Sequence, residues 1–305
     1  MDARLMASVD FDLDEWSAAH LVQVEQALQR WIDPEAPAGL GQAMRYAALD
    51  GGKRLRPLLV LAASEAAGGN PQAGLRAACA VELIHAYSLV HDDMPCMDND
   101  VLRRGKPTVH VQFGQAQALL AGDALQALAF ELLAPDDGSV SANITARLCR
   151  LLARAAGYHG MAGGQAIDLA SVGCALTQAQ LQTMHRLKTG ALLQASVMLG
   201  AACADLVENE HATTALAEYG AALGLAFQVV DDILDVTADS ATLGKTAGKD
   251  VAHDKPTYVA LLGLDPAQQY AQALLAQALR ALDSSGLPDT RSLKALADKV
   301  VNREK

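Results

Sequence analysis

The sequence predicts an all-α protein, built as a helical bundle. Alanine supplies about one residue in five and aromatic residues only 4% of the 305 positions, a balance that favours close-packed helices over sheets. Apolar residues recur with helical spacing in several long segments, whereas the alternation of a half-buried strand is nearly absent. With 51% hydrophobic and 19% charged residues, the chain can bury a large core and is not intrinsically disordered.

Short clusters of Gly, Pro or Asp divide the chain into segments of helix length. None of them is a long low-complexity linker, so we expect residues 1–305 to form a single domain. The clusters lie at residues 33–37, 68–71, 92–107, 135–139, 157–164, 173 and 243–256.

Three segments carry clear helical signals. Residues 72–90 have an apolar stripe at i, i+3, i+4 and i+7, in which Glu82 is the one charged member. Thr177, with a glutamine three positions later, forms the pattern of a capping box and opens a run that we expect to be helical through Leu199. Residues 215–235 predict another long helix.

The charge and cysteine content restrict partners and compartment. Lys and Arg number 24 against 35 Asp and Glu, for a net charge of −11, which argues against a nucleic-acid partner or a broad membrane-surface partner. The five cysteines are an odd number without C-x-x-C spacing, which favours a reducing compartment. The start of the chain lacks the pattern of a secretory signal, and no apolar stretch reaches about 20 residues. We therefore expect a cytoplasmic protein without membrane insertion.

Two aspartate-rich segments stand more than a hundred residues apart: the first aspartate segment (residues 91–100) and the second aspartate segment (residues 228–235). Asp231 and Asp235 are spaced i, i+4, so on a helix their carboxylates share one face. Asp92 and Asp98 would point about 240° apart on an ideal helix. A proline lies between them at position 95. It is expected to end or kink the helix and to let the next turn bring Asp98 back toward Asp92.

Such carboxylate pairs at the ends of apolar runs indicate a site for a hard cation. One such segment alone is equally well explained as a solvated helix end, but two are not. Mg²⁺ is typically held by a few carboxylates together with substrate phosphates and water, and the glycine and glutamate spacing of a calcium-binding EF-hand is absent. The pattern therefore favours a phosphate-bearing substrate bridged by Mg²⁺.

Basic residues gather locally, as phosphate recognition requires. Residues 51–57 place Lys53, Arg54 and Arg56 after a Gly-Gly pair, and residues 102–107 place three more cations beside the first aspartate segment. Arg54 also has a purely structural interpretation, as a surface charge on a helix.

Taken together, six strings in the same order resemble the trans-isoprenyl diphosphate synthases, and most of all the bacterial farnesyl diphosphate synthases. They are GGKRLRP at 51–57, YSLVHDDMPCMD at 87–98, LRRGKPT at 102–108, GGQ at 163–165, KTG at 188–190 and FQVVDDILD at 227–235. The resemblance implies an isoprenoid synthase fold, with helices around a deep central cavity, and a homodimer. It also implies a transferase of isoprene biosynthesis, a prenyltransferase that makes farnesyl diphosphate from isopentenyl, dimethylallyl and geranyl diphosphate.

The resemblance further implies three Mg²⁺ ions per active site. Asp92 and Asp98 would bind metal on the allylic diphosphate, and Asp231 would bind a further ion from the opposite wall. Asp93 and Asp235 belong to the same motifs in supporting or second-ligand roles. The metal ligands implied are Asp92, Asp98, Asp231 and Asp235.

The same family pattern assigns the substrate contacts. The side chains implied for the diphosphate of isopentenyl diphosphate are Lys53, Arg56, His85 and Arg104; those for the allylic diphosphate are Arg103, Lys188, Lys245 and Lys255. Thr189 and Gln228 would line the reacting carbons. The residues implied in catalysis are Asp92, Asp93, Asp98, Arg103, Lys188, Asp231 and Lys245. His85 enters through the family pattern alone, because a lone histidine on a helix is otherwise a common structural residue.

Product length is expected to depend on Tyr87 and Ser88, more than one helical turn before Asp92. In the family, a bulky aromatic residue at the first of these positions stops growth at fifteen carbons, so Tyr87 favours farnesyl diphosphate. If Tyr87 is an ordinary core residue, geranylgeranyl diphosphate becomes the alternative product. A class I terpene cyclase and a silent regulatory subunit are weaker alternatives, since neither explains both the basic residues at 51–57 and two complete aspartate segments.

Overall fold

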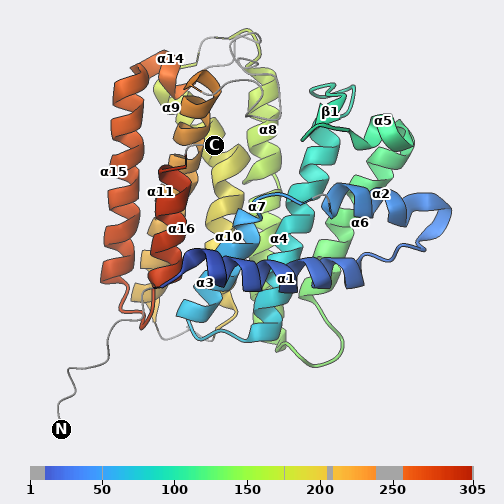
Figure 1. Cartoon of the computed structure of the whole chain (residues 1–305), viewed down its shortest axis with the longest axis horizontal. Coiled ribbons are helices and arrows are strands. Elements are labelled where there is room, and N and C mark those ends of the chain that lie inside the picture. Colours follow the sequence, from blue (N-terminus) through green and yellow to red (C-terminus); the bar gives the residue numbers. More distant parts are fainter. Residues whose placement is uncertain (1–10, 50, 175, 205–208, 238–256, 304–305) are drawn as a thin grey trace.

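Helices account for nearly all of the described part of the chain, which confirms the all-α prediction. The computed structural model describes residues 11–49, 51–174, 176–204, 209–237 and 257–303. In Figure 1 most of the long helices run roughly side by side, and α1 (Leu13–Trp31) lies across several of them. Asp12 caps α1 by accepting hydrogen bonds from two backbone amides of its first turn.

The remaining elements follow in two groups. Those before residue 160 are η1 (Pro37–Gly39), α2 (Leu40–Ala48), α3 (Leu55–Ala66), α4 (Pro71–Asp92), β1 (Leu102–Arg103), β2 (Lys106–Pro107), α5 (Val109–Phe113), α6 (Gln115–Leu133) and α7 (Ala142–Ala156). Those after it are α8 (Met161–Ala170), α9 (Gln178–His185), the π-helical turn η2 (Arg186–Gly190), α10 (Ala191–Ala202), α11 (Glu210–Thr237), α14 (Tyr258–Leu262), α15 (Leu264–Ser284) and α16 (Arg291–Val301).

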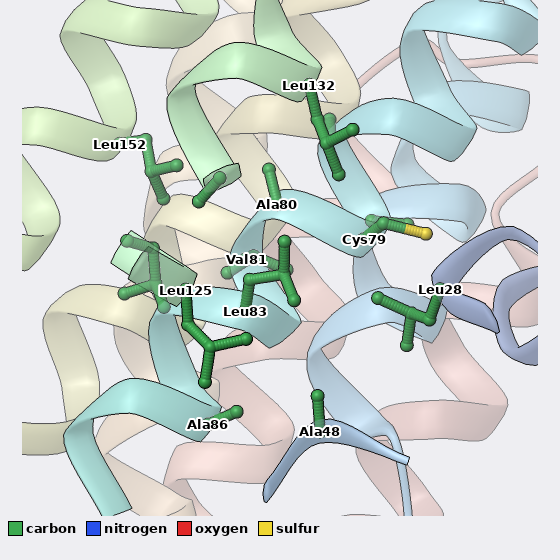
Figure 2. Close-up of a cluster of buried hydrophobic side chains, with 14 of the residues drawn as sticks. Leu28, Ala48, Cys79, Ala80, Val81, Leu83, Ala86, Leu125, Leu132 and Leu152 are labelled. Carbon is green, nitrogen blue, oxygen red and sulfur yellow. The ribbon is translucent and has the colours of Figure 1, made fainter. Parts of the chain in front are cut away.

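Helix α4 lies at the centre of the first of two cores. Asn70 caps its N-terminus with its side chain, and Pro71 occupies the first turn, where a missing N–H is tolerated. Figure 2 shows leucines of α1, α4, α6 and α7 meeting around small α4 residues such as Ala80 and Ala86. Each fully buried leucine contributes about 1.5–3 kcal/mol, and the alanines let the helices approach closely.

The second core joins α3 and α10 to α11, α15 and α16. Its two largest fully buried side chains are Tyr219 and Tyr258, and the Tyr219 hydroxyl donates to the Leu293 carbonyl at 2.8 Å. Trp16 of α1 packs against both cores. The two clusters are therefore tied together by helices that belong to both.

The segment after α4 contains the two strands of the described chain. Leu102 pairs with Pro107 and Arg103 with Lys106 in an antiparallel hairpin. Its two central residues, Arg104 and Gly105, both have positive φ, at 52° and 76°, as in the tight hairpin turns that follow the twist of β-strands. The hairpin carries Arg103 and Arg104, two of the arginines predicted to bind phosphate.

Helix boundaries differ from prediction in several places. Helix α11 begins at Glu210, five residues before the predicted start, and the predicted break at 243–256 lies outside the described residues. The capping box at Thr177 is present, but the run to Leu199 is broken by η2, because a π-helical turn at residues 186–190 shifts the backbone register. The predicted break at 157–164 is shorter than expected, since α8 begins at Met161. Here α8 packs directly on η2: a Cβ on Gly164 would lie 2.1 Å from the Lys188 backbone nitrogen.

By length and composition alone, two of the described helices, α4 and α6, are long and apolar enough to cross a membrane. The apolar window of α4 is 67% buried inside the protein, as suits a core helix, while that of α6 is 39% buried. Helix α6 thus exposes more of its apolar window than α4 does, including Leu119 and Leu120.

Candidate active site

The first aspartate segment folds back on itself at the end of α4. Asp92 is the last residue of that helix, and its carbonyl accepts a hydrogen bond from the Asp98 backbone nitrogen at 2.9 Å. The Asp100 nitrogen likewise donates to the Asp93 carbonyl at 3.1 Å. This is the return predicted from Pro95, which lies in the turn and lets the chain come back to Asp92 within six positions.

The carboxylate of Asp92 is under electrostatic strain. Burial and the nearby charge of Asp98 raise its pKa to about 6, against the opposing effect of Lys188. A partly buried carboxylate beside a second one is stabilised by a cation, so the donor set suits a divalent ion. No group of three or more His, Cys, Asp or Glu side chains is preassembled for a metal within the described residues, as expected where substrate phosphates and water supply the other ligands.

Asp93, the neighbour of Asp92, serves a different purpose. Its side chain is 3% exposed, and it accepts three hydrogen bonds of 2.6–3.0 Å from the Nε and Nη2 atoms of Arg103. This two-pronged contact fixes the plane of the guanidinium and leaves its remaining N–H groups for another acceptor. The predicted supporting role of Asp93 therefore takes the form of holding Arg103.

Lys188 lies in η2, where the backbone departs from regular α-helix. Its ammonium group forms an ion pair with Asp168 of α8, and its charge also reaches Asp92. Thr189 follows in the same turn and is partly buried. Asp168 was not among the predicted site residues. It lies three positions after the Gly-Gly-Gln string, a spacing that would place it one helical turn further along the same face.

The second aspartate segment lies near the C-terminal end of α11. Asp232 is 7% exposed and accepts a hydrogen bond of 2.7 Å from the Tyr258 backbone nitrogen, so it secures α14 against α11. Asp235 is also buried, at 8% exposed. Gln228 is partly buried one turn before these aspartates. Asp231 is the most exposed of the three carboxylates and forms an ion pair with Arg303.

Arg303, close to the end of the chain, was not predicted to belong to the site. Its guanidinium stacks on the Phe227 ring at 4.3 Å from the ring centroid and donates to the Phe227 carbonyl at 3.3 Å. Its charge reaches Lys53, where burial and then Arg303 lower the pKa of the ammonium group. A single arginine outside any motif gives no signal in the sequence, and only the tertiary fold brings it to the second aspartate segment.

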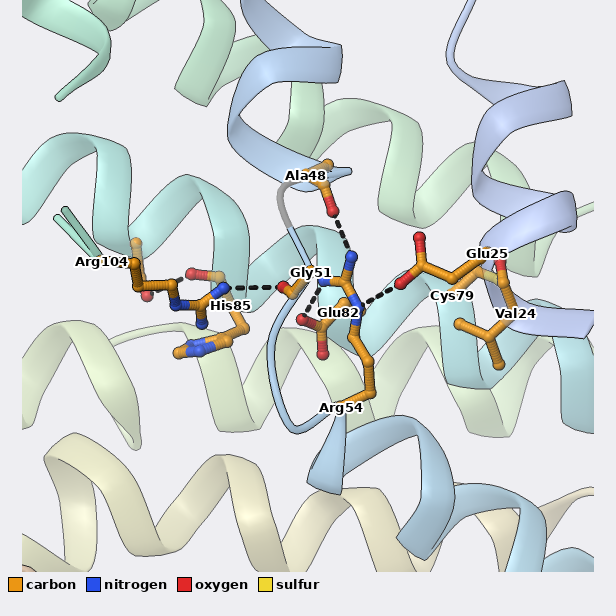
Figure 3. Close-up of polar contacts among 10 residues, drawn as sticks. Val24, Glu25, Ala48, Gly51, Arg54, Cys79, Glu82, His85 and Arg104 are labelled. Carbon is orange, nitrogen blue, oxygen red and sulfur yellow. Dashed lines mark hydrogen bonds and ion pairs between the residues drawn. The ribbon is translucent and has the colours of Figure 1, made fainter. Parts of the chain in front are cut away.

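A second basic cluster surrounds His85. Burial and the charges of Arg56 and Arg104 lower the pKa of His85 well below its usual 6.5, so the ring is neutral near pH 7. Figure 3 shows Arg104 beside His85, with its Nη1 donating to the Gly51 carbonyl at 2.7 Å. Gly52 leaves the space that this contact requires, because a Cβ there would lie 2.7 Å from Arg104. This gathering of basic groups suits an anion such as a diphosphate.

Arg54, in contrast, is a structural residue and not a surface charge. It is 5% exposed and donates to Glu25, to Glu82 and to the Ala48 carbonyl, each at 2.7 Å. Figure 3 shows these contacts converging on its guanidinium. They also explain why the stripe of α4 contains one glutamate.

The two residues expected to control product length both lie on α4. Tyr87 is partly buried and packs against the first core, and burial together with the charge of Asp92 raises the pKa of its hydroxyl. Ser88 donates its hydroxyl to the His85 carbonyl at 2.8 Å. Lys245 and Lys255 lie outside the described residues.

The fold and site define a class: an all-α protein in which two acidic helix segments are each flanked by basic side chains. Comparison with known proteins identifies that class. The family model for polyprenyl synthetase matches residues 37–291, and the chain belongs to this family. The predicted resemblance to trans-isoprenyl diphosphate synthases is thereby confirmed, and the protein is a prenyltransferase.

Particular relatives span nearly the whole chain. It is 47% identical to the farnesyl diphosphate synthase of Escherichia coli (strain K12), over 96% of this chain and 100% of the relative. A chloroplastic geranylgeranyl pyrophosphate synthase of Catharanthus roseus is 43% identical over 98% of this chain and 83% of its own length. The crystal structure of an FPP/GFPP synthase from Zymomonas mobilis superposes with a TM-score of 0.83 at 41% identity, covering 95% of this chain and 98% of that one.

Proposed function

We propose that the protein condenses isopentenyl diphosphate head-to-tail with dimethylallyl and then geranyl diphosphate, and so makes farnesyl diphosphate. The observation that carries this proposal is that basic side chains reach two places near the first aspartate segment. Arg56 and Arg104 act on His85. Arg103 and Lys188 act on Asp92 and are each held by a carboxylate of their own. Two such places match two diphosphate substrates, whereas a terpene cyclase needs one. Relatives named for farnesyl diphosphate support the fifteen-carbon product, and relatives named for geranylgeranyl pyrophosphate keep the longer one as the alternative.

Mg²⁺ would be held by Asp92 and Asp98 on one side and by Asp231 and Asp235 on the other. When bound it would neutralise the charge that develops on the diphosphate leaving group. We propose three ions per active site. The partly buried carboxylate of Asp92, with its raised pKa, supports this assignment, because an unneutralised pair is unfavourable there.

The side chains of the protein would then divide the work between the two substrates. Arg103, held by Asp93, and Lys188, held by Asp168, would stabilise the departing diphosphate of the allylic substrate, together with Lys245 and Lys255. The isopentenyl diphosphate would be oriented by Lys53, Arg56, His85 and Arg104. Its double bond attacks C1 of the allylic cation, and a proton then leaves to the released pyrophosphate. Thr189, Gln228 and apolar helix faces would line the reacting carbons and exclude water.

Product length would be limited by Tyr87, with Ser88 beside it. The ring of Tyr87 packs into the first core below Asp92, where a chain growing away from the metal site would meet it. Its size at this depth supports a stop at fifteen carbons.

Product analysis tests the proposal. Purified protein with Mg²⁺ and labelled isopentenyl diphosphate is given dimethylallyl, geranyl or farnesyl diphosphate in separate reactions. We expect a fifteen-carbon end product from the two shorter primers and no extension of farnesyl diphosphate. Extension to twenty carbons would keep the chemistry and establish the geranylgeranyl alternative. Cyclised or hydrolysed products without condensation would point to a cyclase, and activity only with an added partner would point to a silent subunit.

We further propose a single-domain cytoplasmic protein that forms homodimers. Five unpaired cysteines suit a reducing compartment, and the shared packing of Trp16 against both cores supports one domain. The exposed apolar face around Val111, Leu119 and Leu120 supports a dimer. These residues are 46–53% exposed and lie on α5 and α6, and exposed apolar side chains grouped on neighbouring helices favour cover by a second copy.

A further inference from the structure

His91 lies between the predicted chain-length residue and helix α6. Its ring meets the Tyr87 ring edge-on, with the centroids 5.7 Å apart and the planes at 75°. This is a favourable geometry for aromatic side chains. The two residues are i and i+4 on α4, so they occupy the same face of the helix. Tyr87 is thus in contact with a second ring on the side nearer Asp92.

The position of the His91 ring is fixed from α6. Its Nε2 donates a hydrogen bond to the Leu119 carbonyl at 3.1 Å. Gly122, one turn further along α6, provides the space for the ring: a Cβ at this position would lie 2.1 Å from Nε2 and 2.5 Å from Cδ2. No side chain larger than hydrogen at position 122 is compatible with this ring position. The imidazole of α4 therefore occupies a space that the glycine of α6 leaves open.

We propose that His91 is a positioning residue for the chain-length stop at Tyr87. Gly122 of α6 contributes by leaving the space in which the His91 ring is held. The anchored imidazole limits the rotation of the Tyr87 ring and so keeps it across the path of the growing chain. Product length then depends on a layer of three residues from two helices, not on Tyr87 alone. This inference rests on the proposed function of the Tyr87 site.

The experiment compares the wild type with Tyr87→Ala, His91→Ala and the double variant, using dimethylallyl diphosphate and isopentenyl diphosphate with Mg²⁺. For His91→Ala we expect the ratio of twenty-carbon to fifteen-carbon product to rise about tenfold or more, a discrimination typical of a reshaped apolar pocket. The kcat and KM for the first condensation should stay at wild-type values, because a ten-carbon product is too short to reach the stop. In the Tyr87→Ala background, His91→Ala should change the ratio no further.

His211→Ala is the matched control, since His211 also bonds through Nε2 to a carbonyl of a neighbouring helix, at Ser284, but far along the chain from Tyr87. It should leave the product ratio unchanged. Gly122→Ala approaches the same layer from α6 and should lengthen the product by displacing the His91 ring; melting temperatures of all variants identify any that fail to fold.

The experiment distinguishes failure of the proposed Tyr87 stop from failure of the proposed His91 role. If Tyr87→Ala leaves the product at fifteen carbons, the proposed stop itself is wrong. If Tyr87→Ala lengthens the product but His91→Ala lowers all rates equally without changing the ratio, the stop stands and His91 is merely structural. If the two substitutions add in the double variant, His91 acts independently of Tyr87 and the positioning role is overturned.

Discussion

Arg54 and Glu82 form an ion pair that is almost completely buried between α3 and α4, with side chains 4% and 5% exposed. Such a pair is weak evidence for net stability, because both charges lose their hydration, but removal of one partner leaves the other charge stranded. Glu25 adds a second, half-buried carboxylate to the same guanidinium. The contacts hold the start of α3 just after Lys53. They therefore stabilise the fold and also fix the position of the basic residues at 51–57.

Arg54→Met should therefore reduce the free energy of unfolding by about 3–5 kcal/mol. Urea denaturation, monitored by circular dichroism, measures this free energy. Lys294→Met is the matched control, because its ion pair with Asp283 is exposed and should contribute less than about 1 kcal/mol. Equal effects of the two substitutions would show that burial of the Arg54 pair is not what matters.

The ion pair of Arg303 is expected to weaken metal binding. Its guanidinium pairs with Asp231, one of the proposed Mg²⁺ ligands, so a cation already competes for that carboxylate. Arg303→Gln should lower the Mg²⁺ concentration for half-maximal activity about threefold, as expected for loss of one partly exposed ion pair. Calorimetric titration of the protein with Mg²⁺ alone should show the same trend.

The neighbouring Lys299→Gln removes an exposed charge that pairs with Asp14 and should leave the Mg²⁺ requirement unchanged. An increased requirement in Arg303→Gln would mean that Arg303 supports metal binding, and would reverse this interpretation.

At the scale of elements, hydrogen bonds to Glu65 of α3 hold α1 against that helix. His20 Nε2 and Trp16 Nε1 both contact the Glu65 carboxylate, at 2.7 and 3.0 Å. The bond to Glu65 raises the pKa of His20 above 6.5. Burial opposes the effect on Glu65, yet the hydrogen bonds from His20 and Trp16 outweigh it and lower its pKa below 4.5.

The pH dependence follows from these directions. The contribution of His20 is complete below pH 6.5 and is lost as the pH rises through its raised pKa, while that of Glu65 is present above pH 4.5 and is lost on acidification. The stability lost in His20→Gln should therefore be larger at about pH 6 than at about pH 9. Thermal unfolding across this range measures it. In a Glu65→Gln background the difference should disappear, and its persistence there would assign the pH dependence to another group.

At the scale of the whole molecule, the exposed apolar residues of α6 form the expected interface of the proposed homodimer. Its apolar window is only 39% buried, and Leu119 and Leu120 are exposed on it. Leu119→Glu combined with Leu120→Glu should shift the protein from dimer to monomer in analytical ultracentrifugation, because a charge within an apolar interface is unfavourable. Val22→Glu, at an equally exposed position of α1, should leave the dimer intact. A wild-type monomer would refute the proposed homodimer.

Sequence reasoning predicted the local geometry of the two aspartate segments because their motifs are local. The return of Asp98 to Asp92 depends on a proline between them, and the i, i+4 spacing of Asp231 and Asp235 depends only on helix geometry. The break of the run to Leu199 was missed, since a π-helical turn has no simple pattern in side-chain periodicity.

By itself, the sequence determined the all-α class, the family and the two acidic segments, since composition, helical period and motif spacing are properties of the chain alone. The tertiary structure decided which charges are structural and which belong to the site. Arg54 and Arg56 are two positions apart, yet Arg54 is neutralised by the buried Glu82 and Arg56 joins the basic groups at His85. Arg303, Asp168 and the pairing of His91 with Gly122 depend on contacts between distant helices. Local patterns carry no information about such contacts, because burial and charge pairing arise only when helices pack.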